Sequence, residues 1–251
     1  MTTDYDPIAE QYQRSKQQPW RTCLEAFSLL NLVGDPTGKS VLDLACGEGF
    51  YTRQICRRGA ARTVGIDLSA GMIELAQQQE SSQALGIEYL VSDARTLEVA
   101  DQFDVVVSAY LLNYARDAAE LQSMCQSIAR ALKPGGRFVT VNSSPLLHFP
   151  SAPSFRPYGF ETRVTGDWGP GAPIKWIFHL PDGTFEIENY FLCQQTHEAA
   201  FRQAGFDEIC WHSPQLSPEG MTAQGESYWE TFLQHSPIVL IECRKSSHAA
   251  P

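Results

Sequence analysis

A glycine turn flanked by acidic residues is the part of this chain best suited to holding a ligand. The stretch VLDLACGEGFYT runs from an apolar strand pattern through Asp43 to Gly47 and Gly49. Glycine lets the backbone approach a bound molecule because no Cβ stands in the way. Asp67 ends the next strand pattern eighteen residues after Gly49, close to the roughly 20-residue spacing at which an acid binds ribose hydroxyls. This pattern indicates a nucleoside site at the end of a strand.

Two classes of ligand use such a turn, and the residues around it favour one of them. A dinucleotide site needs G-x-G-x-x-G, but Thr52 stands at the position of the third glycine. Glu48 would oppose a nearby pyrophosphate, whereas the carboxylate of Asp43 suits a cation. We therefore expect a ligand that has an adenosine part and a positive charge but no phosphates. An NAD(P)-dependent oxidoreductase on the same sheet topology is the alternative.

Alternating strand and helix patterns are expected to position these residues. Ser69 is the expected N-cap of the helix that follows Asp67. Strands that alternate with helices of this length form βαβ units, which predicts a parallel sheet with both faces covered. The predicted strands are 40–46, 63–69, 87–93, 103–109 and a fifth within 132–143, and the predicted helices are 49–58, 69–81 and 117–132.

The remaining segments are expected to complete a single domain over residues 1–251, around a core at 38–142. Residues 1–34 predict two helical pieces, which begin with Asp6 as an N-cap and stop at Gly34. Residues 143–195 are rich in proline, glycine and aromatics, which indicates an insertion over the carboxyl edge of the sheet, with a hairpin turn at 181–183. Residues 196–244 predict a helix capped by Thr196 and ended by Gly205, then strands at 207–212 and 237–243.

Composition limits the partners that the protein can have. The net charge of −10 and the pI near 5.0 disfavour nucleic acid, because the field of the protein repels polyanions. Seven cysteines without a C-x-x-C pair, together with scattered histidines, predict free thiols and no metal site. The chain has no run of 18 apolar residues, and from its acidic, polar first residues we expect no secretory signal. We expect a cytoplasmic protein that acts on a small molecule away from membranes; the sequence predicts no oligomeric state.

Five segments follow one another in the order of a known pattern: VLDLACGEGFYT, VGIDLS, SDARTL, FDVVVSAYLLNY and LKPGGRF. Together they resemble the motifs of class I S-adenosylmethionine (SAM) dependent methyltransferases, over about residues 38–142 plus the last two strands. The resemblance implies an α/β, Rossmann-like fold with a seven-stranded, mostly parallel sheet and helices on both faces. It also implies an N-terminal helical lid over 1–34, a β-hairpin insertion over the carboxyl edge at 143–195, and SAM as methyl donor. The product would be S-adenosylhomocysteine, and no metal is implied.

The same resemblance implies which residues bind the donor. Asp67 would hold the ribose hydroxyls and Asp93 would lie near the adenine amino group, although a helix-capping turn is the alternative for Asp93. Tyr12 belongs either to a lid near the sulfonium or to the packing of a cover helix. Lys16 either pairs with the carboxylate of the donor or lies on the surface. The expected donor-binding residues are Asp43, Ala45, Gly47, Gly49, Asp67, Leu68, Met72, Asp93, Ala94, Tyr5, Tyr12 and Lys16.

A more specific similarity, to bacterial toxoflavin (azapteridine) N-methyltransferases, is carried by YDPIAEQYQRSK, AYLLNYA and the aromatic-rich hairpin. We expect the acceptor to be a small planar heteroaromatic or phenolic metabolite of secondary metabolism, methylated on N or O. Tyr110, Asn113 and Tyr12 are expected to position it, with Tyr114 beside them. The residues expected to line its pocket are Trp168, Trp176, Phe178, His179 and Tyr190. A small core beneath the hairpin is the alternative for this aromatic group.

The chemistry expected here needs little besides positioning. Methyl transfer from a sulfonium is an in-line displacement, and holding the reacting atoms collinear lowers its barrier by several kcal/mol. The sequence contains no obvious pair of nucleophile and base, which agrees with methyl transfer better than with acyl or phosphoryl transfer. A SAM-binding regulatory subunit without catalysis is a further alternative, against which the aromatic insertion argues.

Overall fold

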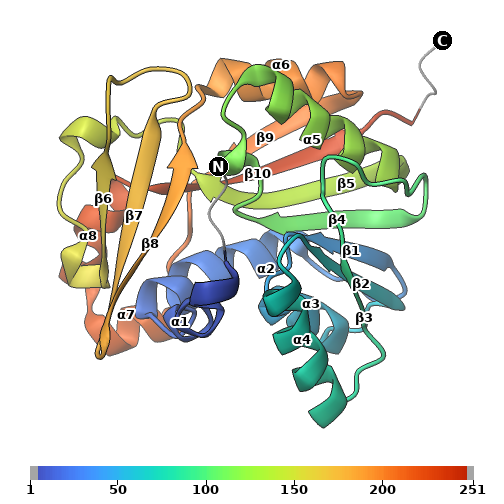
Figure 1. Ribbon diagram of the computed structural model, residues 1–251, viewed down its shortest axis with the longest axis horizontal. Helices are drawn as coiled ribbons and strands as arrows, with labels where there is room; N and C mark the ends of the chain where they lie inside the picture. The colour runs from blue at the N-terminus through green and yellow to red at the C-terminus, as the bar shows by residue number, and fades with distance from the viewer. Residues whose placement is uncertain (1–4, 248–251) are drawn as a thin grey trace.

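A mixed seven-stranded sheet organises the chain in the computed structural model, which describes residues 5–247 (Figure 1). The strand order is β3-β2-β1-β4-β5-β10-β9. The first five strands of that order pair in parallel, and β10 runs antiparallel to both of its neighbours. The strands are β1 (Ser40–Leu44), β2 (Arg62–Asp67), β3 (Glu88–Val91), β4 (Phe103–Ala109), β5 (Leu132–Ser143), β9 (Phe206–His212) and β10 (Ile238–Lys245).

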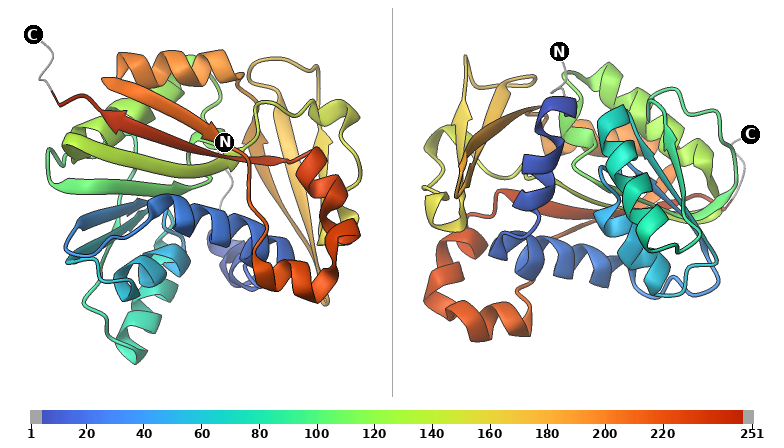
Figure 2. Two further views of the ribbon diagram at one scale, coloured as in Figure 1. Left: turned by 180° about the vertical axis from the view of Figure 1, so that it is seen from behind. Right: turned by 60° about the horizontal axis from the view of Figure 1, so that its bottom comes forward.

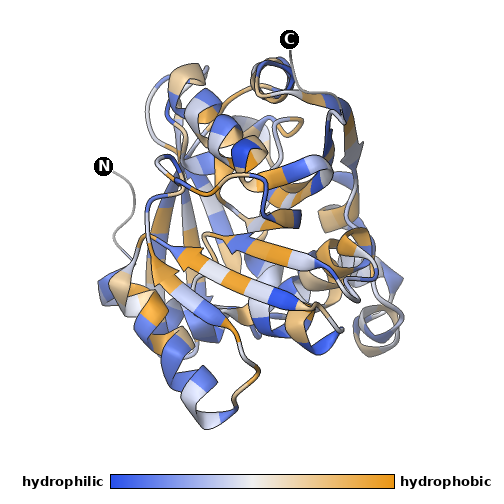
Figure 3. Ribbon diagram, turned by 90° about the vertical axis from the view of Figure 1, so that its right-hand side faces the viewer, coloured by the Kyte–Doolittle hydropathy of each residue, from blue (hydrophilic) through white to orange (hydrophobic). Residues whose placement is uncertain are grey.

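Both faces of this sheet are buried, because apolar side chains alternate between two hydrophobic clusters along each central strand. In β4, Val105 and Val107 belong to one cluster and Val106 to the other. Helices α2, α3 and α4 cover one face, and α5 and α6 cover the opposite face (Figures 1 and 2). Figure 3 shows apolar residues along the strands beneath these helices. Burial on both faces explains why the strands read as apolar runs rather than as strict alternation.

The helices follow the positions of their capping residues. Ser69 accepts a hydrogen bond from the Met72 backbone amide and caps α4, as predicted, and Asp117 caps α5 in the same way. Gly34 ends α2 with a φ of 73°, a conformation open to glycine. The helices are α1 (Ala9–Ser15), α2 (Phe27–Val33), α3 (Phe50–Arg57), α4 (Ala70–Ser82), α5 (Ala118–Ala131), α6 (Gln194–Gln203), α7 (Pro218–Gln224) and α8 (Glu226–Gln234).

Short helical turns complete the chain. A π-helical segment, η2, precedes α2, and the others are turns of 3-10 helix. These segments are η1 (Asp6–Ile8), η2 (Arg21–Ala26), η3 (Leu112–Tyr114), η4 (Phe149–Ser151) and η5 (Arg156–Tyr158).

Two predicted caps are wrong. Asp6 does not cap its own segment, because its carboxylate accepts hydrogen bonds from Ser69 Oγ and the Gly71 amide at the start of α4. Thr196 is an interior residue of α6, whose N-cap is Cys193. In both cases a polar residue near a helix start was assigned to the wrong position, since several turn residues stood close together.

The insertion forms a second, antiparallel sheet of order β6-β7-β8. The predicted hairpin joins β7 (Pro173–Leu180) to β8 (Gly183–Tyr190), whereas β6 (Phe160–Val164), α7 and α8 were not predicted. One face of this sheet packs on the N-terminal helices and on α8 in a single hydrophobic cluster. Figures 1 and 2 show α1 between this sheet and helices α3 and α4. Within the described residues, no helix is long and apolar enough to cross a membrane.

Candidate functional site

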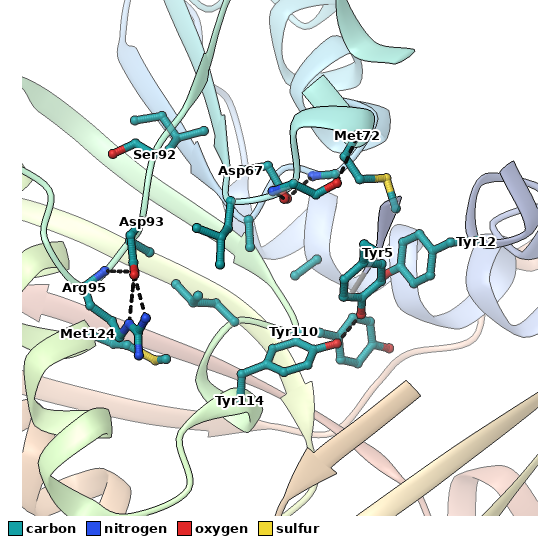
Figure 4. A pocket seen from close by; sticks show the side chains of 18 of the residues that line it. Tyr5, Tyr12, Asp67, Met72, Ser92, Asp93, Arg95, Tyr110, Tyr114 and Met124 are labelled. Atoms are coloured by element: carbon teal, nitrogen blue, oxygen red, sulfur yellow. Dashed lines mark hydrogen bonds and ion pairs between the residues drawn. The ribbon is translucent and has the colours of Figure 1, made fainter. Parts of the chain in front are cut away.

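A cavity of about 350 Å³ opens at the carboxyl ends of β1, β2 and β4 (Figure 4). Its size suits one nucleoside-sized ligand, and the carboxyl edge of a parallel sheet is where such ligands bind. The predicted residues that line it are Tyr5, Tyr12, Ala45, Gly47, Asp67, Leu68, Met72, Asp93, Ala94, Tyr110 and Tyr114. The remaining lining residues are Asp6, Ile66, Ser69, Ser92, Arg95, Ala109, Leu111 and Met124.

Asp67 holds the glycine turn and the start of α4 together. One carboxylate oxygen accepts the Gly47 amide at 2.8 Å, and the other accepts the Ser69 amide at 2.9 Å. Burial raises the pKa of Asp67, and these backbone hydrogen bonds oppose the shift. The oxygens keep lone pairs that can receive further donors. A carboxylate fixed in this way at the rim of the cavity can accept a pair of ligand hydroxyls.

The two glycines of the turn have different roles. Gly47 lines the cavity with a φ of 56°, and an added Cβ would meet only Met72 Sδ at 4.0 Å. Gly49 does not line the cavity, and an added Cβ would lie 2.3 Å from the hydroxyl oxygen of Tyr89. The expectation that both glycines approach the ligand is therefore corrected for Gly49, which is required by the packing of α3.

Asp43 lies behind the turn and does not line the cavity. Its side chain is buried, and its Oδ2 accepts a hydrogen bond from Thr52 Oγ1 at 2.6 Å. Burial raises the pKa of Asp43 to about 7, against the opposing hydrogen bond from Thr52. Because its side chain does not line the cavity, any effect of Asp43 on a ligand acts through its charge.

At one end of the cavity a carboxylate and a guanidinium form an ion pair (Figure 4). Arg95 Nη2 lies 2.6 Å from Asp93 Oδ2, and the Arg95 amide donates to Asp93 Oδ1 at 2.8 Å. Hydrogen bonds from Arg95 lower the pKa of Asp93. Asp93 closes a turn, but no helix lies between β3 and β4, so the helix-capping alternative is wrong.

Four tyrosines gather at the other end (Figure 4). The rings of Tyr5 and Tyr12 meet edge to face at 5.2 Å between centroids, and the hydroxyls of Tyr5 and Tyr114 share a hydrogen bond. Tyr110 has a φ of 65°, in the left-handed region that residues other than glycine rarely adopt. Aromatic faces attract cations and exclude water. This end of the cavity therefore suits a positively charged group.

Lys16 is neither a surface residue nor a lining residue. Its side chain is buried, and its Nζ lies 3.1 Å from Glu25 Oε1. The ammonium also lies 5.2 Å from the centroid of the Tyr12 ring and 5.8 Å from that of Tyr110. The surface alternative for Lys16 is wrong, because an ion pair and aromatic rings compensate its burial inside the N-terminal helical segment.

The residues expected on the acceptor side lie outside the cavity. Trp176 and Phe178 are fully buried on the inner face of the second sheet, stacked with each other and with its neighbours. The two residues are two positions apart on β7, so both rings point to the same face of the sheet, toward the core. This agrees with the alternative that these aromatic residues form a small core beneath the hairpin. Trp168 packs on Phe191 at 4.2 Å between centroids, and His179 Nε2 lies 3.0 Å from Glu161 Oε2.

Asn113 and Tyr190 line a separate, smaller cavity together with the end of β5 and the start of α6. Asn113 therefore lines the smaller cavity, while its neighbour Tyr114 lines the larger one.

Sequence reasoning missed Arg95, Leu111 and Ser92, although each lies within two residues of a predicted site residue. Asp6 directly follows the predicted site residue Tyr5 but was assigned only a capping role, and Met124 carried no signal because it belongs to none of the recognised motifs. Within residues 5–247, no group of three or more His, Cys, Asp or Glu side chains is arranged to hold a metal ion.

Comparisons with known proteins agree with this geometry. Residues 41–136 match the family model described as a methyltransferase domain. The chain is 31% identical over 148 residues to demethylmenaquinone methyltransferase of Lactococcus lactis, which covers 57% of this chain and 56% of that protein. It is 26% identical over 170 residues to N-demethylindolmycin N-methyltransferase of Streptomyces griseus, with coverage of 67% and 70%. An S-adenosylmethionine dependent methyltransferase structure from Mesorhizobium loti matches with a TM-score of 0.63 at 20% identity, over 92% of this chain and 100% of that chain.

The sheet order and the glycine turn at its carboxyl edge define the class I SAM-dependent methyltransferase fold, so the predicted fold class is confirmed. Within this fold, residues 41–136 are the part that matches the methyltransferase-domain family model. That segment contains the glycine turn, Asp67 and Asp93 and ends before the insertion, so the family match concerns the donor side. The stretch matched to the Lactococcus protein spans little more than half of that protein, 56% of its length.

Proposed function

We propose that this protein is a SAM-dependent methyltransferase that methylates N or O of a small planar heteroaromatic or phenolic metabolite. We further propose that it works in the cytoplasm and in secondary metabolism. The observation that carries the proposal is the cavity of about 350 Å³, with carboxylates at two strand ends and a tyrosine cluster at its far end. Relatives named as methyltransferases of menaquinone and indolmycin precursors support a small-molecule acceptor.

The lining of the cavity suits a cationic nucleoside better than a dinucleotide. Asp6, Asp67 and Asp93 bring negative charge to it, and Arg95, the one basic lining residue among residues 5–247, is paired with Asp93. A pyrophosphate would meet repulsion there. The position of the third glycine of a dinucleotide motif is filled by Thr52, which hydrogen-bonds Asp43 instead. These features count against the oxidoreductase alternative.

We assign roles along the length of the cavity. Asp67 would receive the ribose hydroxyls, the turn of Asp93 and Ala94 would contact the adenine, and the backbone of Ala45 and Gly47 would follow the amino-acid part. Tyr5, Tyr12 and Tyr110 would enclose the sulfonium end. The donor supplies a methyl group on a positively charged sulfur, which aromatic faces stabilise.

The tyrosines are suited to positioning rather than to proton abstraction. Burial raises the pKa of Tyr110 well above its ordinary value, and burial and the Tyr114 hydroxyl do the same for Tyr5. Both phenols therefore stay protonated near neutral pH and act as hydrogen-bond donors. The rate enhancement would come from holding the nucleophile in line with the transferred methyl group and from excluding water.

Ligand-induced thermal stabilisation tests the donor assignment. S-adenosylhomocysteine at a 100-fold excess over its Kd should raise the melting temperature by roughly 5 to 10 °C, because a ligand that binds only the folded state stabilises it. NADH should give no shift. Asp67→Ala should abolish the response to S-adenosylhomocysteine, while Asp207→Ala, which removes an exposed carboxylate on β9, should retain it.

Incubation with labelled SAM and a panel of phenols, pyridones and fused heteroaromatics tests the transfer. Label recovered in an acceptor is the expected result. Binding of S-adenosylhomocysteine without transfer to any panel member would favour a regulatory SAM-binding subunit. A shift with NADH and none with S-adenosylhomocysteine would favour the oxidoreductase.

A further inference from the structure

A second chamber lies beside η3, the short helical turn whose Tyr114 lines the donor cavity. It has a volume of about 10 Å³, and its lining residues include ones from the ends of β5 and β8 and from α6. Tyr114 lines the donor cavity, whereas the preceding Asn113 lines this chamber. We call it the polar chamber, and its polar lining residues are Asn113, Asn142, Ser143, Ser144, Tyr190 and His197.

Asn113 brings an unused amide to the polar chamber. The residue is 2% exposed, and neither Oδ1 nor Nδ2 has a hydrogen-bond partner in the described part of the chain. The neighbouring Asn142 is used differently, because its Oδ1 accepts the Asn113 backbone amide at 3.0 Å. Buried polar groups are nearly always paired, so a buried amide with both atoms free needs an explanation.

His197 brings an unpaired hydrogen-bond acceptor to the polar chamber. Its Nδ1 lies 3.0 Å from the carbonyl oxygen of Cys193, and a carbonyl can only accept, so Nδ1 carries the proton. Burial lowers the pKa of His197, which keeps the ring neutral. Nε2 is therefore an unprotonated acceptor, and it has no partner among residues 5–247.

Asn189 links the polar chamber to the donor cavity. Its Oδ1 accepts from Ser143 Oγ at 3.4 Å, and its side chain also hydrogen-bonds Tyr114. Asn189 is 1% exposed, so this connection is shielded from solvent. Hydrogen bonds thus join Ser143 of the polar chamber to a tyrosine that lines the donor cavity.

We propose that the polar chamber recognises the methyl acceptor, and that the acceptor presents an amide-type edge with adjacent N–H and C=O groups, as in a lactam or imide ring. The inference rests on the proposed function and specifies its substrate class. The free donor and acceptor of Asn113 are complementary to such an edge, and His197 Nε2 receives a further N–H. Phe149 and Phe191, which also line the chamber, offer flat apolar faces beside it.

The size of the chamber limits what enters it. About 10 Å³ is room for about one water molecule, so one polar group at the edge of an acceptor would enter in place of that water. The rest of the ring then lies toward Tyr114 and the donor cavity. A phenol lacks the adjacent donor and acceptor and leaves the amide of Asn113 unpaired. Sites built to hydrogen-bond a substrate discriminate strongly against analogues that lack the matching groups.

Binding of simple probes to the protein saturated with S-adenosylhomocysteine tests the proposal. Calorimetry should show 2-pyridone and uracil binding roughly tenfold more tightly than phenol. Asn113→Leu should remove this preference and leave the affinity for S-adenosylhomocysteine unchanged. His197→Asn, whose amide can replace Nδ1 but not Nε2, should weaken the lactam probes, and His197→Gln should restore part of their affinity. His235→Asn, at an exposed histidine, is the matched control.

Two results would overturn the inference. One is equal affinity of the wild-type protein for phenol and 2-pyridone, and the other is an unchanged preference in a folded Asn113→Leu or His197→Asn variant. Either would mean that the polar chamber holds structural water only. If Asn113→Leu fails to fold, the wild-type preference and the two His197 variants decide. Donor binding and methyl transfer that persist without lactam preference would refute this inference alone, whereas absence of donor binding would refute the proposed function.

Discussion

The Tyr110 hydroxyl donates a hydrogen bond to Glu25 Oε2 at 2.5 Å, which connects the wall of the donor cavity to a carboxylate inside the N-terminal helical segment. Glu25 is 0% exposed. Tyr110 holds a φ of 65°, a backbone conformation that costs a residue other than glycine about 1–3 kcal/mol. The bond to Glu25 therefore helps to keep a strained residue in one orientation at the candidate site.

Glu25 is the hub of a buried ionic cluster. It pairs with Lys16 and Arg21 at 3.1 and 3.0 Å and accepts a further hydrogen bond from Tyr51. Burial by itself would raise the pKa of Glu25, but Arg21, Lys16 and the two tyrosine hydroxyls outweigh it and bring the pKa to about 2. The carboxylate is thus charged throughout the neutral range and balances two buried cations.

Removal of that charge should destabilise the protein strongly. Glu25→Gln leaves Lys16 and Arg21 buried without compensation, which costs about 3–5 kcal/mol and should lower the melting temperature by roughly 10 °C. Tyr110→Phe removes one hydrogen bond to a charged group and should cost about 1.5–3 kcal/mol. Thermal unfolding followed by circular dichroism measures both effects.

The control for this prediction is Glu230→Gln, which neutralises an exposed carboxylate on α8 and should shift the melting temperature little. A Glu25→Gln protein as stable as the wild type would show that the buried cations find other partners.

The raised pKa of Asp43 predicts a dependence of stability on pH. Because the folded state binds this proton more tightly than the unfolded state, Asp43 stabilises the fold most when it is protonated. This contribution is lost as the pH rises from the ordinary value near 3.8 through about 7. Asp43→Asn should remove this loss of stability at higher pH. The free energy of unfolding of the variant, relative to that of the wild type, should therefore increase between about pH 5 and pH 8. Urea unfolding of both proteins across that range measures the difference.

Ionisation of Asp43 should also affect the affinity for the donor, but here a rise in pH should be favourable. A ligand with net positive charge favours ionised Asp43, so SAM should bind more tightly as the pH rises through about 7. S-adenosylhomocysteine, which lacks the sulfonium charge, should show a weaker dependence. Parallel pH profiles for the two ligands, or a profile unchanged in Asp43→Asn, would contradict the prediction.

The donor side of the protein was predictable because its determinants are local in sequence. Gly47, Asp67 and Ser69 each sit within a few residues of a strand end or a helix start, and their types report the turn or cap that they form. Parallel strands then bring these ends to one edge of the sheet. Short-range patterns therefore sufficed for the strands and for the cap of α4, and the family resemblance that these patterns support supplied most of the cavity lining.

The acceptor side was less predictable because it depends on packing between distant segments. Aromatic content alone did not tell that Trp176 and Phe178 face the core, nor that a third strand would join the hairpin. The contact between Glu25 and Tyr110 joins residues 85 positions apart. No periodicity in the sequence indicates such a pair. The burial of Lys16, whose ammonium pairs with Glu25, was unpredictable for the same reason.

Alanine substitutions at the two glycines of the turn should separate folding from binding. At Gly49 the new Cβ would lie 2.3 Å from the Tyr89 hydroxyl, so we expect a loss of about 3 kcal/mol in stability. At Gly47 the Cβ meets only Met72 at 4.0 Å. The expected cost is mainly backbone strain, about 1 kcal/mol, together with a marked loss of donor affinity.

Gly38→Ala provides the baseline for these variants, because Gly38 has a φ of 73° and no neighbour within 4 Å of an added Cβ. It should report backbone strain alone. Thermal unfolding and calorimetry with S-adenosylhomocysteine measure the two effects. Equal losses of stability at Gly47 and Gly49 would argue against the assignment of Gly49 to packing.

Asp6 should control how long the donor stays bound. Its carboxylate accepts from Ser69 Oγ at 2.5 Å and from the Gly71 amide at 3.1 Å, so it ties the N-terminal segment to the start of α4 beside the cavity. Asp6→Ala removes both bonds and should raise the dissociation rate of S-adenosylhomocysteine roughly tenfold, with little change in the melting temperature of the free protein. Glu10→Ala, at an exposed position of the next turn, should leave the rate unchanged. Stopped-flow displacement measures both rates, and equal rates in the two variants would mean that the N-terminal segment does not retain the donor.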